Sequence, residues 1–274
     1  MTPERGLSSQ LENNMRDVKI GKVLFMDQKY GEALSFFREG AAEGCAECAF
    51  NYAYMKLHGY GCSVDLGEAR SFFALASGII GEACYNLAVM YMHGSGCSRD
   101  YRKSYEYMRD AAEKGVIEAR LYLGSAHIIG YLIEPNIVSI SLIPYHTPEY
   151  REQNMMLEGD VPDLEDDEQR RIRAVRMDHK ASFEWFREAA RQSPTYVEDL
   201  SKDAKYLYAR CFLDGVGVDF NRDKANALML LAAADGSAEA RAYLETDAPY
   251  VLSALENKKL VEKIRREARL APPG

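Results

Sequence analysis

The sequence predicts an all-α protein that is built from repeated pairs of antiparallel helices. When the chain is shifted by 35 residues against itself, the segment that starts at Asn51 aligns with the one that starts at Asn86, and a Gly-x-Gly turn, a cysteine and an aspartate recur at the same spacing. Around these turns, apolar residues follow the 3.6-residue period of a helix. One helix pair cannot bury its apolar face alone, so we expect the pairs to stack into a solenoid.

Small and large side chains alternate within the best-defined unit, residues 81–115. The small ones permit close helix packing, and they are Ala83, Ala88, Ala111 and Ala112. The large ones fill the space between the helices, and they are Leu87, Met90, Tyr91, Tyr107 and Met108. The unit is therefore expected to consist of helix A, a glycine turn, helix B and a terminal glycine.

This unit resembles the Sel-1-like repeat, a branch of the tetratricopeptide superfamily. The positions that carry the resemblance are Leu87, Tyr91, Gly94, Gly96, Asp100, Ala111 and Ala112. The resemblance implies a right-handed α-solenoid of antiparallel helix pairs, whose members serve as adaptors and scaffolds for protein complexes.

The pattern divides the chain into a repeat region, residues 1–249, and a capping helix with a tail, residues 250–274. The repeat units are expected at about 9–43, 46–80, 81–115, 117–192 and 202–236, with a half-unit from residue 238. The first unit lacks the Gly-x-Gly loop and is closer to an ordinary tetratricopeptide unit, with helix A at about 9–26 and helix B at about 31–43.

The fourth unit is interrupted in its turn by an insertion at residues 131–176. Gly94 and Asp100 are 6 positions apart, whereas Gly130 and Asp178 are 48 apart, so the turn contains 42 extra residues. A plain surface insertion is one interpretation, because long loops cost little closure entropy. The other is that the segment packs over the solenoid or contributes to a partner site, as long non-repetitive loops often do.

Composition and charge exclude several classes of protein. The net charge of −8 disfavours a nucleic-acid partner or an anionic membrane surface. No apolar run is long enough for a spanning helix, and no secretory leader is visible, so we expect a cytoplasmic protein, or a periplasmic one if a leader has been removed.

The concave helix-A surface is the predicted partner site. Its acidic row is Glu47, Glu82, Glu118 and Asp203, and its apolar row is Phe50, Tyr85, Leu121 and Tyr206. Five further positions on the same helices complete the predicted set: Asn51, Tyr54, Asn86, Tyr122 and Arg210. Aromatic anchors beside carboxylates suit a partner protein with a basic and hydrophobic surface.

Both rows also have a structural interpretation. The aromatic row could be core between repeats, and the acids could lie at helix N-termini, where they meet the helix dipole favourably. Asn51 and Asn86 could clamp a peptide backbone, but they do not recur in later units, where Tyr122 and Leu207 stand. We therefore expect a folded partner rather than a clamped peptide.

The chemically reactive residues do not form a recognisable catalytic or metal site. His58, Cys62, His93 and Cys97 have the residue types of a zinc set, but equivalent positions of neighbouring repeats lie about 10 Å apart, too far for one ion. Cys45-x2-Cys48 lacks a surrounding βαβ pattern and is interpreted as structural. No nucleophile elbow, phosphate loop or H-E-x-x-H motif is present. We expect a non-enzymatic protein without metal or cofactor.

The leading hypothesis is a bacterial adaptor or scaffold that binds one protein through its concave surface and the insertion. The main alternative is an immunity protein that covers the active site of a toxic effector. A third possibility is a component of a quality-control or envelope complex, and the residues alone do not separate these three.

Overall fold

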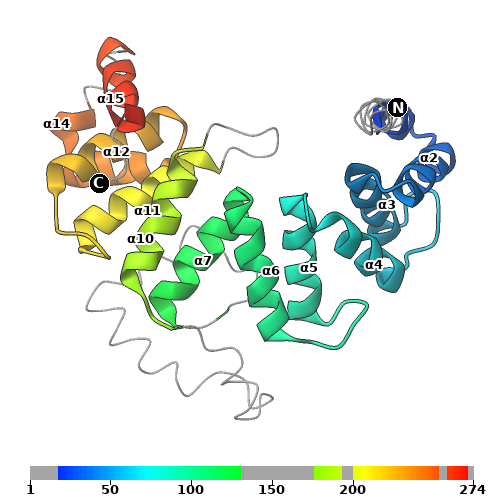
Figure 1. Cartoon of the computed structure of the whole chain (residues 1–274). Coiled ribbons are helices and arrows are strands. Elements are labelled where there is room, and N and C mark those ends of the chain that lie inside the picture. The colour runs from blue at the N-terminus through cyan, green and yellow to red at the C-terminus, as the bar shows by residue number, and fades with distance from the viewer. Residues whose placement is uncertain (1–17, 131, 133–175, 193–199, 253–257, 271–274) are drawn as a thin grey trace, which may run out of the picture. The chain divides into compact units, whose positions relative to one another are not determined.

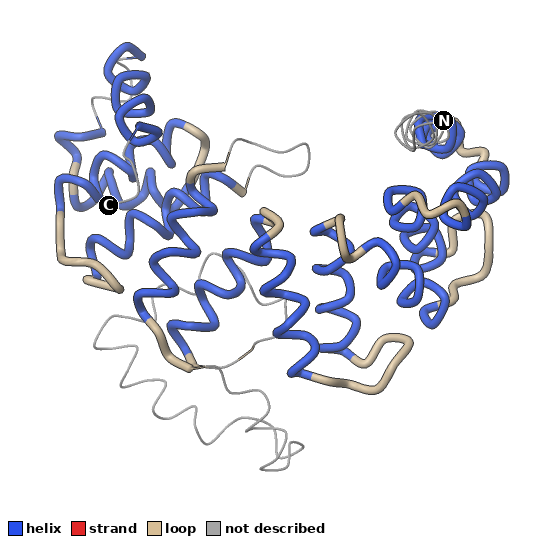
Figure 2. The backbone as a smooth tube through the Cα atoms, viewed as in Figure 1, coloured by secondary structure: helices blue, strands red, loops and turns tan. Residues whose placement is uncertain are grey.

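The computed structural model describes residues 18–130, 132, 176–192, 200–252 and 258–270, and within these ranges it consists of helices joined by turns (Figures 1 and 2). No strand is present in the described ranges. The chain forms two compact units, residues 1–116 and 117–274, which we describe separately. The predicted all-α fold class is confirmed.

The first unit is a stack of short helices connected by tight turns. Residues 18–26 are helical, and they are followed by α2 (Tyr30–Ala42), α3 (Ala46–His58), α4 (Leu66–Ala76), α5 (Gly81–His93) and α6 (Tyr101–Glu113). Each of the pairs α3/α4 and α5/α6 packs closely, and α4 in turn packs against α5. The remainder of the first predicted helix, residues 9–17, lies outside the described residues.

The core of the first unit follows the predicted division into small and large side chains. Ala83, Ala88, Ala111 and Ala112 are fully buried where the helices approach each other, and Leu87, Met90 and Met108 are buried between them. Tyr91 and Tyr107 are half-buried and stack, with ring centroids 5.7 Å apart. The helix pair is therefore held by alanine contacts and by large apolar side chains at the same time.

The second unit continues the arrangement of paired helices. It contains α7 (Ile117–Ile129), α10 (His179–Ala190), α11 (Ser201–Asp214), α12 (Arg222–Ala234), α13 (Ala238–Asp247), α14 (Pro249–Leu252) and α15 (Lys258–Leu270). The closest packing is between α7 and α10 and between α11 and α12. One apolar cluster joins these helices, with Phe186, Leu207, Met229 and Leu244 among its buried members.

Helix B begins in the same way in the second to fifth repeats, where it is α4, α6, α10 and α12. The side chains of Asp65, Asp100, Asp178 and Asn221 each accept a hydrogen bond from the backbone N–H three residues later, at 2.9–3.0 Å. This bond satisfies one of the N–H groups that a helix start leaves unpaired. The recurring aspartate of the sequence pattern is therefore an N-cap, and the same bonds lower the pKa of Asp100 and of Asp178.

The second glycine of each Gly-x-Gly turn permits a close backbone approach. Gly61, Gly96 and Gly217 have φ of 71°, 69° and 67°, in the left-handed region. A Cβ atom at Gly96 would lie 2.5 Å from the carbonyl oxygen of Leu66, at the start of the preceding helix B. The missing side chains at Gly61 and Gly217 likewise make room for the starts of α2 and α10.

The 42-residue insertion leaves the turn that contains it closed. In the uninterrupted units, the N-cap amide donates to the carbonyl nine residues earlier, as from Asp100 to Tyr91 at 2.8 Å. In the interrupted unit, the Asp178 amide makes the corresponding bond to His127 at 3.0 Å across the insertion. Apart from Leu132 and Arg176, the predicted insertion lies outside the described residues.

The C-terminal helix α15 packs on the second unit through apolar and charged contacts. Val261 is buried and Ile264 packs against the apolar cluster. Asp235, just after α12, accepts hydrogen bonds from Arg265 of α15 and, at 2.7 Å, from Lys205 of α11. One half-buried carboxylate thus joins three parts of this unit.

Replacement of Gly96 by alanine is expected to destabilise the protein by roughly 2–4 kcal/mol, because it adds left-handed backbone strain and a clash with the Leu66 carbonyl. Gly44 is the matched control, since its φ is 91° but nothing lies within 4 Å of an added Cβ. Gly44→Ala should cost only about 1 kcal/mol. Urea denaturation followed by circular dichroism measures both, and equal losses would refute the close-approach argument.

Replacement of Asp235 by asparagine should loosen α15, because Lys205 and Arg265 would keep their charges without the carboxylate that now pairs with them. We expect a loss of about 1–3 kcal/mol and faster hydrogen exchange in residues 258–270. Glu245→Gln, an exposed change on α13, is the control. Unchanged exchange in α15 would show that the apolar contacts alone hold this helix.

Candidate functional site

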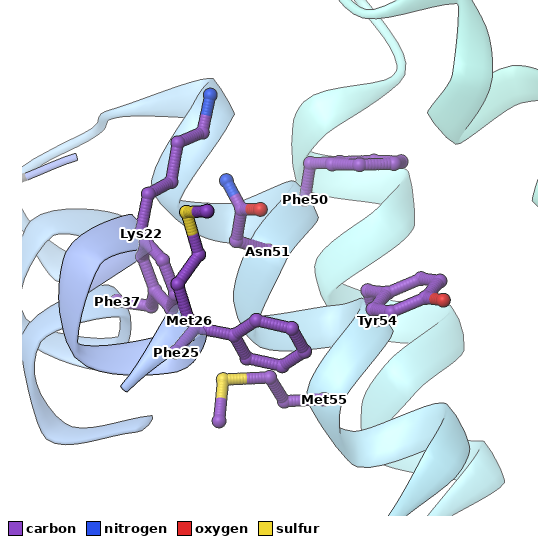
Figure 3. Close-up of a pocket in the computed structure, with 8 residues that line it drawn as sticks. All are labelled: Lys22, Phe25, Met26, Phe37, Phe50, Asn51, Tyr54 and Met55. Atoms are coloured by element: carbon purple, nitrogen blue, oxygen red, sulfur yellow. The ribbon is translucent and has the colours of Figure 1, made fainter. Parts of the chain in front are cut away.

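An open apolar groove of about 300 Å³ lies in the first unit, between helical residues 18–26 and α3 (Figure 3). Its lining residues come from three helices: Lys22, Phe25, Met26, Phe37, Phe50, Asn51, Tyr54 and Met55. Phe37 and Met55 are buried and form its floor. The side chain of Met26, in contrast, is 80% exposed, so the wall formed by residues 18–26 is apolar and open to solvent.

One end of this groove carries an ion pair and an amide. The Lys22 amine lies 2.5 Å from the Glu47 carboxylate. The Asn51 amide nitrogen donates to the backbone carbonyl of Glu47 at 2.7 Å. The polar groups at this end are therefore bonded to one another, and the ion pair neutralises the charge of the groove rim.

The other end of the groove is a cluster of aromatic rings. Tyr54 lies 4.4 Å from His58 and 6.2 Å from Tyr60, measured between ring centroids. Phe25 contacts Tyr60 edge-on at 5.2 Å. These contacts hold Phe25 and Tyr54, on the two walls, against a common support.

A polar network on another side of α3 fixes this helix to α4. The Tyr52 hydroxyl donates to Glu68 at 2.8 Å, and the Lys56 amine lies 2.7 Å from the other carboxylate oxygen. The bond from Lys56 holds the pKa of Glu68 below its usual value, and the same bond raises the pKa of Lys56. Burial, followed by the hydrogen bond to Glu68, raises the pKa of Tyr52.

The predicted partner residues of the first unit lie at or beyond this groove. Phe50, Asn51 and Tyr54 line it, and Glu47 holds the rim lysine. Phe50 also packs on Phe73, with ring centroids 5.7 Å apart, so it serves the core and the groove together. On α5, Glu82 is exposed, Tyr85 and Asn86 are half-buried, and the Asn86 amide donates to the Glu82 carbonyl at 2.9 Å.

The predicted residues of the second unit are divided between surface and core. Leu121, Tyr122 and Asp203 are buried, with 5%, 1% and 3% of their surface exposed. Leu121 belongs to the apolar cluster of the second unit. Because these three side chains are buried, they are not accessible to a partner protein in this structure.

The three other predicted residues of the second unit, Glu118, Tyr206 and Arg210, are half-buried. The Arg210 guanidinium pairs with Asp214 at 3.0 Å and lies 3.5 Å from the Tyr206 hydroxyl. Burial opposes the charge of Arg210, but the neighbouring Asp214 carboxylate contributes to a pKa that is raised overall.

A model of the Sel1 repeat matches the chain at residues 46–77, 81–116, 173–194 and 202–237. The chain is a Sel1-like repeat protein. Sel1 repeats generally mediate protein–protein interaction, and proteins built from them are typically non-enzymatic. The matches at 173–194 and 202–237 fall on helix B of the interrupted unit and on the unit that follows it.

Two solved structures are similar to this Sel1-like chain. A Sel1 repeat protein from Oxalobacter formigenes is 18% identical, with 94% of this chain and 98% of that chain covered and a TM-score of 0.41. The protein c5321, a protective antigen present in uropathogenic Escherichia coli strains displaying an SLR fold, is 17% identical, with 97% and 66% covered and a TM-score of 0.42. Curated protein sequences gave no match.

The recurring cysteines of the Sel1 repeats bond to the backbone. The thiols of Cys62 and Cys97 lie 3.8 and 3.7 Å from the carbonyls of Met55 and Met90, near the ends of their A helices. Burial raises the pKa of the Cys97 thiol. Cys45 acts as an N-cap, because its sulfur accepts from the Cys48 amide at 3.2 Å.

In the part of the chain that is described, no group of three or more His, Cys, Asp or Glu side chains is arranged to hold a metal ion. No helix in those same ranges is long and apolar enough to cross a bilayer.

The second wall of the groove was not predicted from the sequence. Lys22, Phe25 and Met26 lie in the first repeat, at about 9–43, which lacks the Gly-x-Gly turn that marks the repeats at 46–80, 81–115 and 202–236. The available signal was helical spacing: Val18, Gly21 and Phe25 share one side of a helix, and Lys22 and Met26 lie beside them.

The Tyr52–Glu68–Lys56 network predicts a stability change with pH. Because the pKa of Glu68 is lowered in the folded state, its contribution is present above the unfolded pKa of about 4.3 and is lost as the pH falls through the lower folded value. Glu68→Gln should therefore reduce stability at pH 7, by less than about 1 kcal/mol because the pair is partly exposed. The difference from wild type should shrink as the pH falls below about 4 and vanish once the pH lies below the folded pKa of Glu68.

Chemical denaturation at a series of pH values measures this difference. Glu106→Gln, an exposed change on α6, serves as the control and should show no such dependence. A Glu68→Gln effect that is equal at pH 7 and pH 3 would contradict the assignment.

Proposed function

We propose that this protein is a non-enzymatic adaptor that binds a partner protein through the groove of the first unit. The observation that carries the proposal is the groove itself: aromatic and methionine side chains line an open surface beside a neutralised ion pair. Exposed apolar surface of this kind is costly in water and is typical of interaction sites. Tyr54 and Phe50 are the expected anchors, since aromatic side chains dominate binding energy at interfaces.

The acidic row gives a basic partner less support than the sequence implied. This applies to a basic effector of the immunity-protein alternative and to a basic partner of an adaptor alike. Glu47 of that row is paired with Lys22, and Asp203 is buried. Fewer carboxylates are therefore presented to a basic partner than the sequence implied.

Further parts of the predicted site remain proposals. Tyr206 and Arg210 of the second unit are half-buried and polar at their tips, which suits the rim of an interface. The insertion and a cytoplasmic location belong to the same proposal. Both rest on the sequence alone.

Affinity capture from lysate of the source cell tests the adaptor function. Tyr54 is 38% exposed, so Tyr54→Ala should leave the fold intact while recovery of one specific protein falls at least tenfold, as expected for an aromatic anchor worth about 2 kcal/mol. Leu75→Ala is the control, because Leu75 is an exposed residue of α4 that does not line the groove. Quantitative mass spectrometry gives the recovery and thermal unfolding gives the stability.

Two outcomes would contradict the proposal. Recovery that is equal for wild type and Tyr54→Ala would remove the groove as the binding surface. An equal decrease for Leu75→Ala would show that the loss does not come from the groove.

A further inference from the structure

The two walls of the groove of the first unit present side chains at the same helical spacing. Lys22 and Met26 are four residues apart on one wall, and Phe50 and Tyr54 are four residues apart on the other (Figure 3). Four residues of helix rise about 6 Å. Each wall therefore presents side chains at the spacing of one helical turn.

The groove offers few bonding groups to a ligand backbone. Its polar side chains are those of Lys22 and Asn51 and the phenol of Tyr54, and both the lysine amine and the Asn51 amide nitrogen already bond to Glu47. An extended peptide laid in this groove would bring backbone N–H and C=O groups that need partners, and each such group buried without one costs free energy. A helix brings no such groups, because its backbone bonds are internal.

The charge of the groove restricts the ligand further. Among the described residues that line the groove, the one cation is Lys22, which lies 2.5 Å from Glu47, so the two form a neutral pair rather than a field of one sign. A charged side chain placed among Phe25, Met26 and Phe50 would lose its hydration without gaining an unpaired counter-charge. The contacting face of the ligand must therefore be uncharged.

We propose that the groove takes an amphipathic helix of the partner protein, with an uncharged face whose large apolar side chains recur every three to four residues. The helix lies against both helical residues 18–26 and α3, and its anchors enter between Met26 and Tyr54. Such a helix matches the turn spacing of both walls and satisfies its own backbone. This inference rests on the proposed function, since it names the partner class of that same groove.

Synthetic labelled peptides test the inference directly by fluorescence anisotropy with the full chain. The first probe is an 18-residue amphipathic helix, with leucines on one face and glutamines and alanines elsewhere. The second has the same composition in an order that distributes the leucines around the helix. The third carries a central proline that breaks the helix, and the fourth has its central leucine replaced by lysine.

We expect the first probe to bind with a dissociation constant in the micromolar range and the other three to bind at least tenfold more weakly. Met26→Lys should weaken the first probe at least tenfold, because it places a charge in the open wall. Ile79→Lys is the matched control: Ile79 is 79% exposed, almost the same as Met26, but it lies outside the groove lining. It should bind the first probe as wild type does.

The outcomes separate this inference from the proposed function. Equal binding of the helical and proline-containing probes, or no binding by any probe, would overturn the helix inference. If capture of the native partner is still lost in Tyr54→Ala, the groove remains the binding surface but takes a ligand of another shape. If neither the probes nor native capture respond to changes in the groove, both proposals fail.

Discussion

Neighbouring helix pairs can stack closely because the second glycine of each Gly-x-Gly turn has no side chain, so the backbone of the preceding helix B can lie against it. A helix B starts directly against this residue, and any side chain there would displace it. The N-cap aspartate and the cysteine thiol that bonds to the backbone lie within a few residues of that turn. The contact at this glycine therefore sets the distance between stacked helix pairs, which the larger side chains must fill. Residues as different as Cys97 and Ala88 recur with one period because each occupies a fixed place relative to that contact.

The same regularity explains how much of the fold the sequence predicted. In α3 to α6 the recurring residues have local roles: Gly59 and Gly94 follow the two A helices, and Asp65 and Asp100 cap the two B helices. Leu121 is buried, which agrees with the alternative that its row is core, whereas burial of Asp203 was not predicted, since that residue was placed by analogy with Glu47. Their burial depends on neighbours that differ from one repeat to the next. The repeat pattern predicts where each helix lies along the chain. Whether a given side chain is exposed depends on the side chains of the helices packed beside it.

The candidate groove illustrates this limit further. Its α3 wall was predicted from the repeat, but its other wall comes from helical residues 18–26, where no turn motif sets the register. Function in an array of this kind depends on departures from the pattern, because positions that obey the pattern are committed to stacking. Met26 obeys no repeat rule, and it is the most exposed apolar residue of the groove.

The hydrogen bond between the Asp178 amide and the His127 carbonyl has a consequence for how such a chain acquires new parts. This bond joins the end of α7 to the start of α10 directly. The geometry of the helix pair therefore does not fix how many residues lie between His127 and Asp178. The turn therefore accommodates an insertion. The helices α7 and α10 pack on each other although 42 extra residues separate them along the chain, so selection can act on the length of this turn separately from the packing of the helix pair.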